Sequence, residues 1–416
     1  MRSSLLLLAS LLQHASAMPH LAGIKERTLN IANISASDVE HLLNLQSRSL
    51  FDLEGLLSAI PTTIDLPLVA SVGRKRIPDA DHPFIAPGPD DQRGGCPGMN
   101  IMANYGYIPR NGIATVVDMI SGMEEMLGFG PDIAAVIVAL GFIASFDLTT
   151  LTTSIGQTDS RTDGLLTPLF GTAPGFFSKE SHNKFEVDGS MSRVDGYWAN
   201  GDTNHFDSDH WKQHKQLAID KYDGLMTAKF WGEARFMQYN DCRNNNPQCQ
   251  WAIGQQAHAY IAGAFITNTM ASADIHGNAG PPDVESIQTF FGIIEHPNGT
   301  YSQGHGKLPP SKDGYWYRRE PLTVVEQLAT LTETLLAYPV EFGRNDGKLG
   351  HWNADLTDLR NVVENGAACW ILQQARDTQD NRYEGFPLIK GAIGKLVQNL
   401  LAPVFEQLAC TPHSTT

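Results

Sequence analysis

The sequence has few basic residues for its length. Its 416 residues include 30 Lys and Arg against 45 Asp and Glu, so the formal net charge is −15. A protein that binds nucleic acid needs a positive surface for the phosphates, and this charge therefore argues against nucleic acid as a partner. A solvated acidic surface that aids solubility accounts for the excess of acidic side chains.

Long hydrophobic runs are also lacking after the N-terminus. The apolar stretch Leu5–Leu12 follows Arg2 and precedes the small residues "ASA" at 15–17. A basic residue, a short apolar core and a small-residue cleavage site, in this order, are typical of a secretory signal peptide. The run is too short for a membrane-spanning helix, and no later segment reaches about 18 uninterrupted apolar residues. We therefore expect residues 1–17 to be a signal peptide and the protein to be secreted, with no membrane as a partner.

Residues 18–80 are expected to form an N-terminal extension or a propeptide. A capping-box pattern at 37–40 predicts the start of a short amphipathic helix. The sequence Arg-Lys-Arg at 74–76 is compatible with a processing site and equally with an exposed basic loop. The acceptor sequons at Asn33 and Asn298 are consistent with a secreted glycoprotein.

Strand-like alternation is scarce after residue 81, whereas apolar residues recur at helical spacing. This spacing is visible in four segments, 112–129, 131–146, 251–266 and 322–338. The 38 glycines and 23 prolines cluster in the connections between such segments. The sequence therefore predicts an all-α fold, a single compact helical domain with long loops over residues 81–416.

The five cysteines are an odd number. In an oxidising compartment at least one thiol is then left without an intramolecular partner. Cys242 and Cys249 bracket a turn-rich hexapeptide, so a small disulfide loop is geometrically reasonable. A bridge between Cys369 and Cys410 would fix the C-terminal tail. If both pairs form, Cys96 is the unpaired cysteine.

Cys96 stands between two glycines and a proline in the segment "RGGCPGMN". Proline is favoured at the first helical position, so a short helix should begin at Pro97, with Cys96 as its N-cap, and end at Pro109. The backbone N–H groups at that end of a helix lower a thiol pKa and stabilise the thiolate. Gly94 and Gly95 would let a flat, bulky group approach the backbone.

The residues alone leave two roles open for Cys96. A catalytic nucleophile would need a histidine base and a recognisable local signature, and neither is apparent. A zinc site would need several ligands at set spacings, such as paired CxxC units, and the sequence has none. A buried structural thiol and a thiolate that serves as an axial ligand of haem iron both remain.

The wider segment 85–112, "IAPGPDDQRGGCPGMNIMANYGYIPRNG", resembles the proximal segment of the fungal haem-thiolate peroxidases, the group of chloroperoxidase and the unspecific aromatic peroxygenases. In that family the cysteine of an Arg-Gly-Pro-Cys-Pro motif is the fifth ligand of the haem iron. The chain departs from the motif at Gly95, where the family has proline, and at Tyr105, where histidine is usual. The resemblance implies haem b bound through Cys96. It is carried by Arg93, Gly94, Cys96, Pro97, Asn100, Ala103, Asn104, Gly106, Tyr107, Pro109, Arg110 and Gly112.

A second segment, "FEVDGSMSRVDG" at 185–196, resembles the magnesium-binding loop that lies beside a haem propionate in the peroxygenases. The resemblance places the ion on the Glu186 carboxylate, the Val187 carbonyl and the Ser190 hydroxyl. A small hard cation takes oxygen ligands of this kind. The alternative is an ordinary acidic turn in which Asp188 caps a helix.

The segment 251–266 is similar to the distal helix of the family, but the family's catalytic glutamate is missing. That glutamate moves a proton between the two peroxide oxygens, and Gln255 stands in its place. An amide can hydrogen-bond peroxide but cannot accept its proton at physiological pH. His258, one helical turn further on, is the nearest titratable group, and an unperturbed imidazole pKa suits acid–base catalysis. Gln255 and His258 are therefore the candidate catalytic residues, and a histidine satisfied by its neighbours is the alternative for His258.

The resemblance implies a haem-thiolate peroxidase or peroxygenase that uses hydrogen peroxide to oxidise or oxygenate small organic substrates, aromatic ones first, through a Cys-ligated ferryl intermediate. A haloperoxidase is compatible with the same motifs. Two readings from other classes stay open: a catalytically impaired haem-binding protein, and a secreted helical binding protein in which Cys96 is structural. The absorption spectrum of the secreted protein distinguishes them.

Overall fold

The computed structural model describes residues 58–61, 64, 74–142, 145–179, 185–202, 204–270, 272–273, 279–309, 314–317, 321–354, 369, 381–383, 386–408 and 410. The expected signal peptide, the helix predicted to start at 37–40 and the Asn33 sequon lie outside these residues. Ile60, within the expected N-terminal extension, is buried in the main hydrophobic core.

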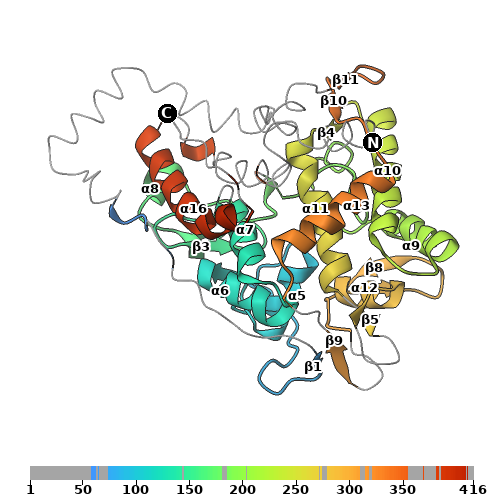
Figure 1. The fold of residues 1–416 in the computed structure, drawn as a ribbon, viewed down its shortest axis with the longest axis horizontal. Helices are drawn as coiled ribbons and strands as arrows, with labels where there is room; N and C mark the ends of the chain where they lie inside the picture. Colours follow the sequence, from blue (N-terminus) through green and yellow to red (C-terminus); the bar gives the residue numbers. More distant parts are fainter. Residues whose placement is uncertain are drawn as a thin grey trace.

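The regular structure is mainly helical, as the sequence predicts, and each of the four segments with helical spacing contains a helix (Figure 1). The longer helices are α5 Pro97–Tyr105, α6 Val116–Gly122, α7 Pro131–Phe142, α9 Ser208–Tyr222, α10 Ala228–Asn245, α11 Ile253–Thr269, α12 Val284–Phe291, α13 Val324–Ala337 and α16 Pro387–Gln407. Shorter helical pieces are the π-helix η1 Met123–Leu127, the 3-10 helices η2 Ser160–Thr162 and η4 Asn381–Tyr383, and α8 Thr167–Phe170.

Short antiparallel strands accompany the helices, so the expectation of a purely helical domain is too strict. Strands of two or three residues form the pairs β1–β9, β2–β3, β5–β6 and β7–β8 and the three-stranded sheet β11–β10–β4. Segments this short show too little alternation to be recognised in the sequence. Their bounds are β1 Arg74–Arg76, β2 Ile113–Thr115, β3 Thr152–Ser154, β4 Gln250–Trp251, β5 Ser272–Ala273, β6 Ala279–Gly280, β7 Ile293–Glu295, β8 Tyr301–Gln303, β9 Tyr315–Tyr317, β10 Gly343–Asn345 and β11 Trp352–Ala354.

The basic stretch at 74–76 is a strand, not the loop considered above. Strand β1 pairs with β9, with Lys75 opposite Trp316. The Lys75 ammonium lies 2.8 Å from the Glu125 carboxylate and over the ring of Tyr107. These contacts hold the stretch against the domain, and cleavage at this position stays a prediction.

Two groups of helices pack against each other in the domain. Helices α10, α11 and α13 lie side by side in one group, and α16 lies against α7 in the other (Figure 1). In the first group, a Cβ at Gly263 of α11 would lie 3.2 Å from the Trp231 ring of α10, so glycine allows this close approach.

Among the described helices, α16 is the one whose length and apolar composition would suffice to cross a membrane. Its apolar residues recur every three or four positions and are buried in the main core beside α7: Ile389, Ile393, Leu396, Val397, Leu400, Leu401, Val404 and Phe405. This one-sided pattern is typical of the core helix of a globular domain.

The cysteines pair as the sequence suggests. Cys242 at the end of α10 is bonded to Cys249, and Cys369 is bonded to Cys410. Cys96 is the free cysteine.

Candidate active site

Cys96 is the residue directly before α5, as predicted. Its backbone is extended, with φ −88° and ψ 111°, and Pro97 is the first helical residue. The helix ends earlier than Pro109, because Gly106 adopts a left-handed conformation with φ 74°. Cys96 is therefore held at a fixed N-terminus of a short helix.

The asparagines of the proximal motif hold the backbone that leads into Cys96. The Asn100 side chain accepts a hydrogen bond from the Gly94 N–H at 3.0 Å and donates one to the Gly94 carbonyl at 2.8 Å. The Asn104 side-chain oxygen accepts from Nε of Arg93 at 2.9 Å. These contacts fix the loop in front of Cys96 from the helix that follows it.

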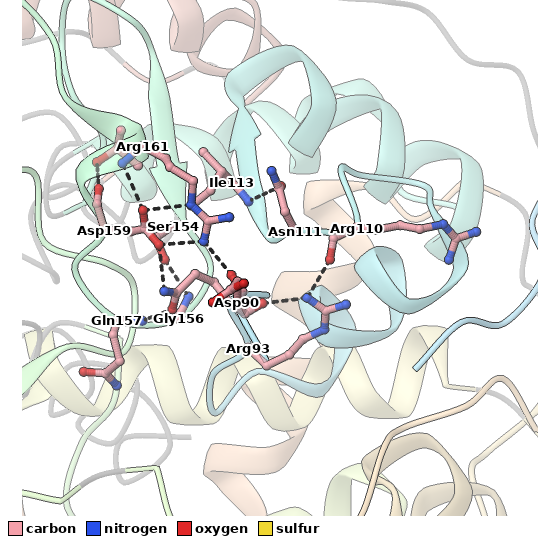
Figure 2. Close-up of polar contacts among 12 residues, drawn as sticks. Asp90, Arg93, Arg110, Asn111, Ile113, Ser154, Gly156, Gln157, Asp159 and Arg161 are labelled. Carbon is pink, nitrogen blue, oxygen red and sulfur yellow. Dashed lines mark hydrogen bonds and ion pairs between the residues drawn. The ribbon is translucent and has the colours of Figure 1, made fainter. Parts of the chain in front are cut away.

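A second set of polar contacts fixes the same loop from the other side (Figure 2). Nη1 of Arg93 donates to the Arg110 carbonyl at 2.9 Å, beyond the end of α5. Arg161 forms an ion pair with Asp159 and donates to the Asp90 carbonyl at 2.7 Å. The Arg161 guanidinium lowers the pKa of Asp159 to about 2, so this ion pair is present across the physiological range.

Of the two glycines before Cys96, Gly95 lies on the wall of the cavity that Cys96 lines, whereas Gly94 leaves no space for a flat group, which corrects the expectation at that position. A Cβ at Gly94 would overlap the Phe177 ring and lie 2.5 Å from the Ile155 carbonyl oxygen. A Cβ at Gly95 would lie 2.7 Å from Nη1 of Arg193 and 2.9 Å from Cε1 of Phe177. Residues from later in the chain fill the space beside Gly94 and form the cavity wall next to Gly95.

Cys96 lines a cavity of about 320 Å³. This volume lies within the range of small-molecule and cofactor sites, which are concave and mostly apolar. Helix α11 supplies one continuous face of the lining, from His258 through Ala262 and Phe265 to Thr269. The apolar lining also includes Leu127, Phe129, Phe146, Phe176, Phe177, Phe185 and Trp231.

His258 lines the same cavity as Cys96 and contacts the edge of the Phe185 ring, with ring centroids 5.6 Å apart. Burial lowers the pKa of His258 to about 4, and the Gln255 carbonyl opposes this shift. The imidazole is therefore neutral at physiological pH. Its Nδ1 atom makes no hydrogen bond within the described part of the chain. This is a different environment from that of a core histidine satisfied by its neighbours.

Gln255, the other candidate catalytic residue, is buried but does not line the cavity. Neither polar atom of its side chain has a hydrogen-bond partner among the residues that the structure describes. The structure thus places His258, and not Gln255, on the cavity wall that it shares with Cys96.

The pKa of the Cys96 thiol is higher than the sequence suggested. Burial raises the pKa of Cys96 and outweighs the backbone N–H groups of Met99 and Gly98 and the charge of Arg193, which lower it. The helix N-terminus thus lowers the pKa of Cys96 as expected, but burial has the larger effect. Coordination to a metal ion deprotonates a thiol outright, and these N–H groups then stabilise the resulting negative charge.

Comparison with known proteins identifies the family. The sequence profile described as "Peroxidase, family 2" matches residues 82–321. The chain belongs to this family, the fungal haem-thiolate peroxidases. It is therefore a haem-thiolate peroxidase, an enzyme of the oxidoreductase class, and the family implies haem as its cofactor.

Individual relatives agree with this assignment. The chain is 26% identical over 351 residues to the aromatic peroxidase fscJ of Fusarium equiseti, an alignment that covers 79% of this chain and 78% of the relative. It is 28% identical over 284 residues to the aromatic peroxygenase of Cyclocybe aegerita, covering 68% of this chain and 69% of the relative. A stretch of 32 residues, 8% of this chain and 9% of the relative, is 56% identical to the chloroperoxidase of Leptoxyphium fumago.

Two arginines that the sequence analysis did not consider make the cavity suitable for haem. Arg193 and Arg235 both line it, and Nε of each is buried without a hydrogen-bond partner within the described chain. A buried guanidinium with free donors favours an anionic partner, and carboxylates match its planar geometry. Haem is a flat apolar ring with two carboxylates, so an apolar cavity with one thiol and two guanidinium groups fits it. Arg193 belongs to the second motif, whereas nothing in the sequence pattern marks Arg235.

Arg235 is fixed by contacts on three sides. It donates hydrogen bonds to the Gly189 carbonyl and to the side-chain oxygen of Gln256, and it lies over the Trp251 ring, 4.5 Å from the centroid. Gln256 in turn donates to the Asp188 carbonyl at 3.0 Å. Helices α10 and α11 therefore position the 185–195 loop through its backbone.

The predicted magnesium ligands lie together in this loop. Val187 and Ser190 line the cavity, and Glu186 is buried. The Ser190 hydroxyl accepts a hydrogen bond from the Ser192 N–H at 3.3 Å. Asp188 does not cap a helix, because its carboxylate accepts from the Gln250 N–H at 3.1 Å. The loop is therefore not an ordinary acidic turn, because two of its residues line the cavity. Its magnesium site stays a prediction.

A separate group of potential metal ligands lies close by but is already used. Side-chain atoms of Asp188, Asp195 and Cys242 lie within 4.8 Å of one another. The Cys242 sulfur is bonded to Cys249. Asp195 accepts hydrogen bonds from the Gly189 N–H and the Asn246 amide. We therefore read this group as structural support for the loop.

Proposed function

We propose that this peroxidase uses hydrogen peroxide to oxidise or oxygenate small organic substrates inside the cavity that Cys96 lines. Aromatic compounds are the proposed substrate class. The observation that carries the proposal is that Cys96 and the neutral His258, whose Nδ1 atom has no hydrogen-bond partner within the described chain, share one apolar cavity. The aromatic peroxygenase of Cyclocybe aegerita and the aromatic peroxidase of Fusarium equiseti, named above, support the substrate class.

Cys96 is the proposed axial ligand of haem b, and Arg193 and Arg235 are the proposed partners of its carboxylates. When bound through a cysteine thiolate, haem supplies the redox chemistry that cleaves the peroxide O–O bond. The apolar side chains of the lining hold an aromatic substrate by burial of its surface and exclude water.

His258 is the proposed acid–base residue in place of the missing glutamate. Its neutral imidazole can accept a proton from one oxygen of peroxide and return it to the other oxygen as the O–O bond breaks. A group of this kind needs to be neutral at the working pH, and the low pKa of His258 satisfies that condition. Gln255 supports this arrangement from the preceding turn through its backbone carbonyl.

Three further features belong to the same proposal. The oxygen atoms of Glu186, Val187 and Ser190 would hold a magnesium ion at the edge of the cavity. Two disulfides are consistent with secretion, because disulfides persist in oxidising compartments. Asn298 is exposed in the turn between β7 and β8, where a glycan can be attached.

An absorption spectrum of the purified protein tests the proposal. The reduced protein under carbon monoxide should show the red-shifted Soret band of thiolate ligation, and Cys96→Ala should abolish it. Met126→Leu is the matched control, since Met126 is fully buried near the site but does not line the cavity. Retention of the band in Cys96→Ala would contradict the assignment of the ligand.

A turnover assay with an aromatic donor tests the reaction. We expect peroxide-dependent oxidation of the donor by the wild-type protein. A normal thiolate Soret band without any turnover would identify the impaired haem-binding protein instead. Oxidation of bromide but of no organic donor would identify a haloperoxidase.

A further inference from the structure

Methionine is concentrated around the active-site cavity. The structure describes nine of the eleven methionines, and six of these line the cavity. They come from different elements that converge on it, namely α5, α6, η1, the 185–195 loop and the residue after α11: Met99, Met102, Met119, Met123, Met191 and Met270.

Simple burial does not explain this distribution. Met126 and Met226 are fully buried in the same core but do not line the cavity, and Met237 is a partly buried residue elsewhere on α10. Met119, Met123 and Met270 are only 3–5% exposed, so bulk solvent barely reaches them either. What distinguishes these three from Met126 and Met226 is their position on the wall of the cavity that Cys96 lines.

A thioether is readily oxidised by oxygen transfer from peroxide. Leucine or isoleucine would fill the same volume without this reactivity. Methionine sulfoxide is polar and chiral, so its formation changes both the polarity and the shape of a cavity wall. Six such groups make the wall itself an oxidisable substrate.

We propose that the six cavity methionines are a self-modification site, at which peroxide that enters the cavity is consumed when no organic substrate occupies it. The proposal rests on the proposed function, because it requires peroxide to reach this cavity. In each event a sulfur–oxygen bond forms and the O–O bond of peroxide breaks. The sulfur loses two electrons, and the second oxygen leaves with both protons as water. No other oxidant or reductant is needed.

The modification changes which substrates the enzyme accepts. Each sulfoxide places a strong hydrogen-bond acceptor on a wall that is otherwise apolar. An apolar substrate has no donor for this oxygen, so its binding leaves the oxygen buried without a hydrogen bond. Peroxide in excess of substrate therefore converts the enzyme to a form with weaker affinity for apolar substrates. The reaction is reversible where a methionine sulfoxide reductase has access to the protein.

Peptide mapping by mass spectrometry tests the proposal on the intact holoenzyme. The protein is treated with hydrogen peroxide without a donor, digested at several times, and the sulfoxide at each methionine is quantified. We expect Met119, Met123 and Met270 to be oxidised faster than Met126 and Met226 by on the order of tenfold, although all five are buried from bulk solvent. Octafluoronaphthalene, an apolar occupant without oxidisable C–H bonds, should slow oxidation of the cavity group only.

Two outcomes would overturn the proposal. One is oxidation of Met126 and Met226 as fast as the cavity group. The other is oxidation confined to Met237 while the cavity methionines stay reduced. A parallel assay of peroxide-dependent oxidation of an aromatic donor separates this proposal from the proposed function. Donor turnover without cavity sulfoxide overturns the self-modification alone, and absence of both overturns the two together.

Paired variants give an independent readout. Met119→Leu with Met123→Leu should remove two sulfoxide sites and slow the peroxide-dependent loss of affinity for an apolar donor. Met126→Leu is the matched control and should leave the rate of that loss unchanged. An equal rate of loss in all three proteins would show that sulfoxide formation does not cause it.

Discussion

Phe177 occupies the space that a side chain at position 94 would need. A Cβ on Gly94 would overlap the ring and also lie 2.5 Å from the Ile155 carbonyl oxygen, which is fixed backbone. At Gly95 the nearest atom is instead Nη1 of Arg193, at 2.7 Å, the far end of a flexible side chain.

The two glycines are expected to respond differently to alanine. Gly94→Ala should destabilise the protein by about 2 kcal/mol, the usual cost of overpacking a site that cannot relax. Gly95→Ala should cost less, because its nearest contacts are the end of the Arg193 side chain at 2.7 Å and the Phe177 ring at 2.9 Å, and neither is a backbone atom. Urea unfolding of the two variants measures the difference. An equal or larger loss in Gly95→Ala would show that Arg193 cannot be displaced.

The part of this site that follows from local chain chemistry was predictable. Pro97 after Cys96 predicts the helix start, and the recurrence of apolar residues predicts the helices. The mistake at Gly94 has a physical cause, because the ring that fills its space, that of Phe177, lies more than 80 residues further along the chain.

The buried environment of Cys96 was not predictable for the same reason. The helix N-terminus is visible in the sequence and favours a thiolate, but burial depends on every element that packs around the sulfur. Arg235 is a similar case. Its partners are a carbonyl at Gly189 and the side chains of Gln256 and Trp251, which only the folded chain brings together.

His258 is expected to control the rate of peroxide cleavage. His258→Ala should lower kcat/KM for peroxide by about 10²–10⁴, the usual contribution of a general acid–base group. The thiolate Soret band should persist, because Cys96, and not His258, is the proposed iron ligand. Gln255→Leu separates the two candidates: if it lowers kcat/KM more than His258→Ala does, then Gln255 carries the role.

The same residue predicts the pH dependence of the reaction. The pKa of His258 in the folded protein is about 4, so the imidazole can accept a proton above this value. The rate constant of the reaction with peroxide should therefore be constant near neutral pH and decrease as the pH falls through about 4. Stopped-flow measurement of the peroxide reaction tests this. Loss of the rate already near pH 6.5, the ordinary pKa of histidine, would place His258 in a solvated environment.

His214 is expected to make stability depend on pH. It is fully buried, its Nδ1 atom lies 2.7 Å from the His210 carbonyl oxygen, and its Nε2 atom faces the Gln238 amide nitrogen at 3.2 Å. Burial lowers its pKa from 6.5 to about 4. A protonated ring would turn Nε2 into a donor that faces another donor. The unfolded chain therefore binds the proton more tightly than the folded chain.

The direction in which stability changes with pH follows from this difference in proton affinity. Stability should be complete above pH 6.5 and fall as the pH decreases toward about 4, with a contribution from His214 of about 3 kcal/mol. His214→Gln should reduce this loss, measured as the shift of the urea midpoint between neutral and acidic pH. His296→Gln, in the β7–β8 hairpin, is the control. An unchanged pH profile in His214→Gln would assign the loss to other groups, His258 among them.

Arg235 is expected to determine how firmly the protein retains haem. Arg235→Met preserves the length and the packing against Trp251 but removes the buried charge, and with it the proposed partner of the haem carboxylates. Loss of one charge-assisted hydrogen bond corresponds to about 2 kcal/mol, or more than tenfold faster haem transfer to a high-affinity acceptor protein. Arg243→Met is the matched control, because Arg243 lies on the same helix over the Trp352 ring but does not line the cavity. Equal haem loss from the two variants would mean that α10 retains haem by packing alone, whereas faster loss from Arg235→Met assigns haem retention to the buried guanidinium together with the 185–195 loop that it holds, a role that no motif in the sequence reveals.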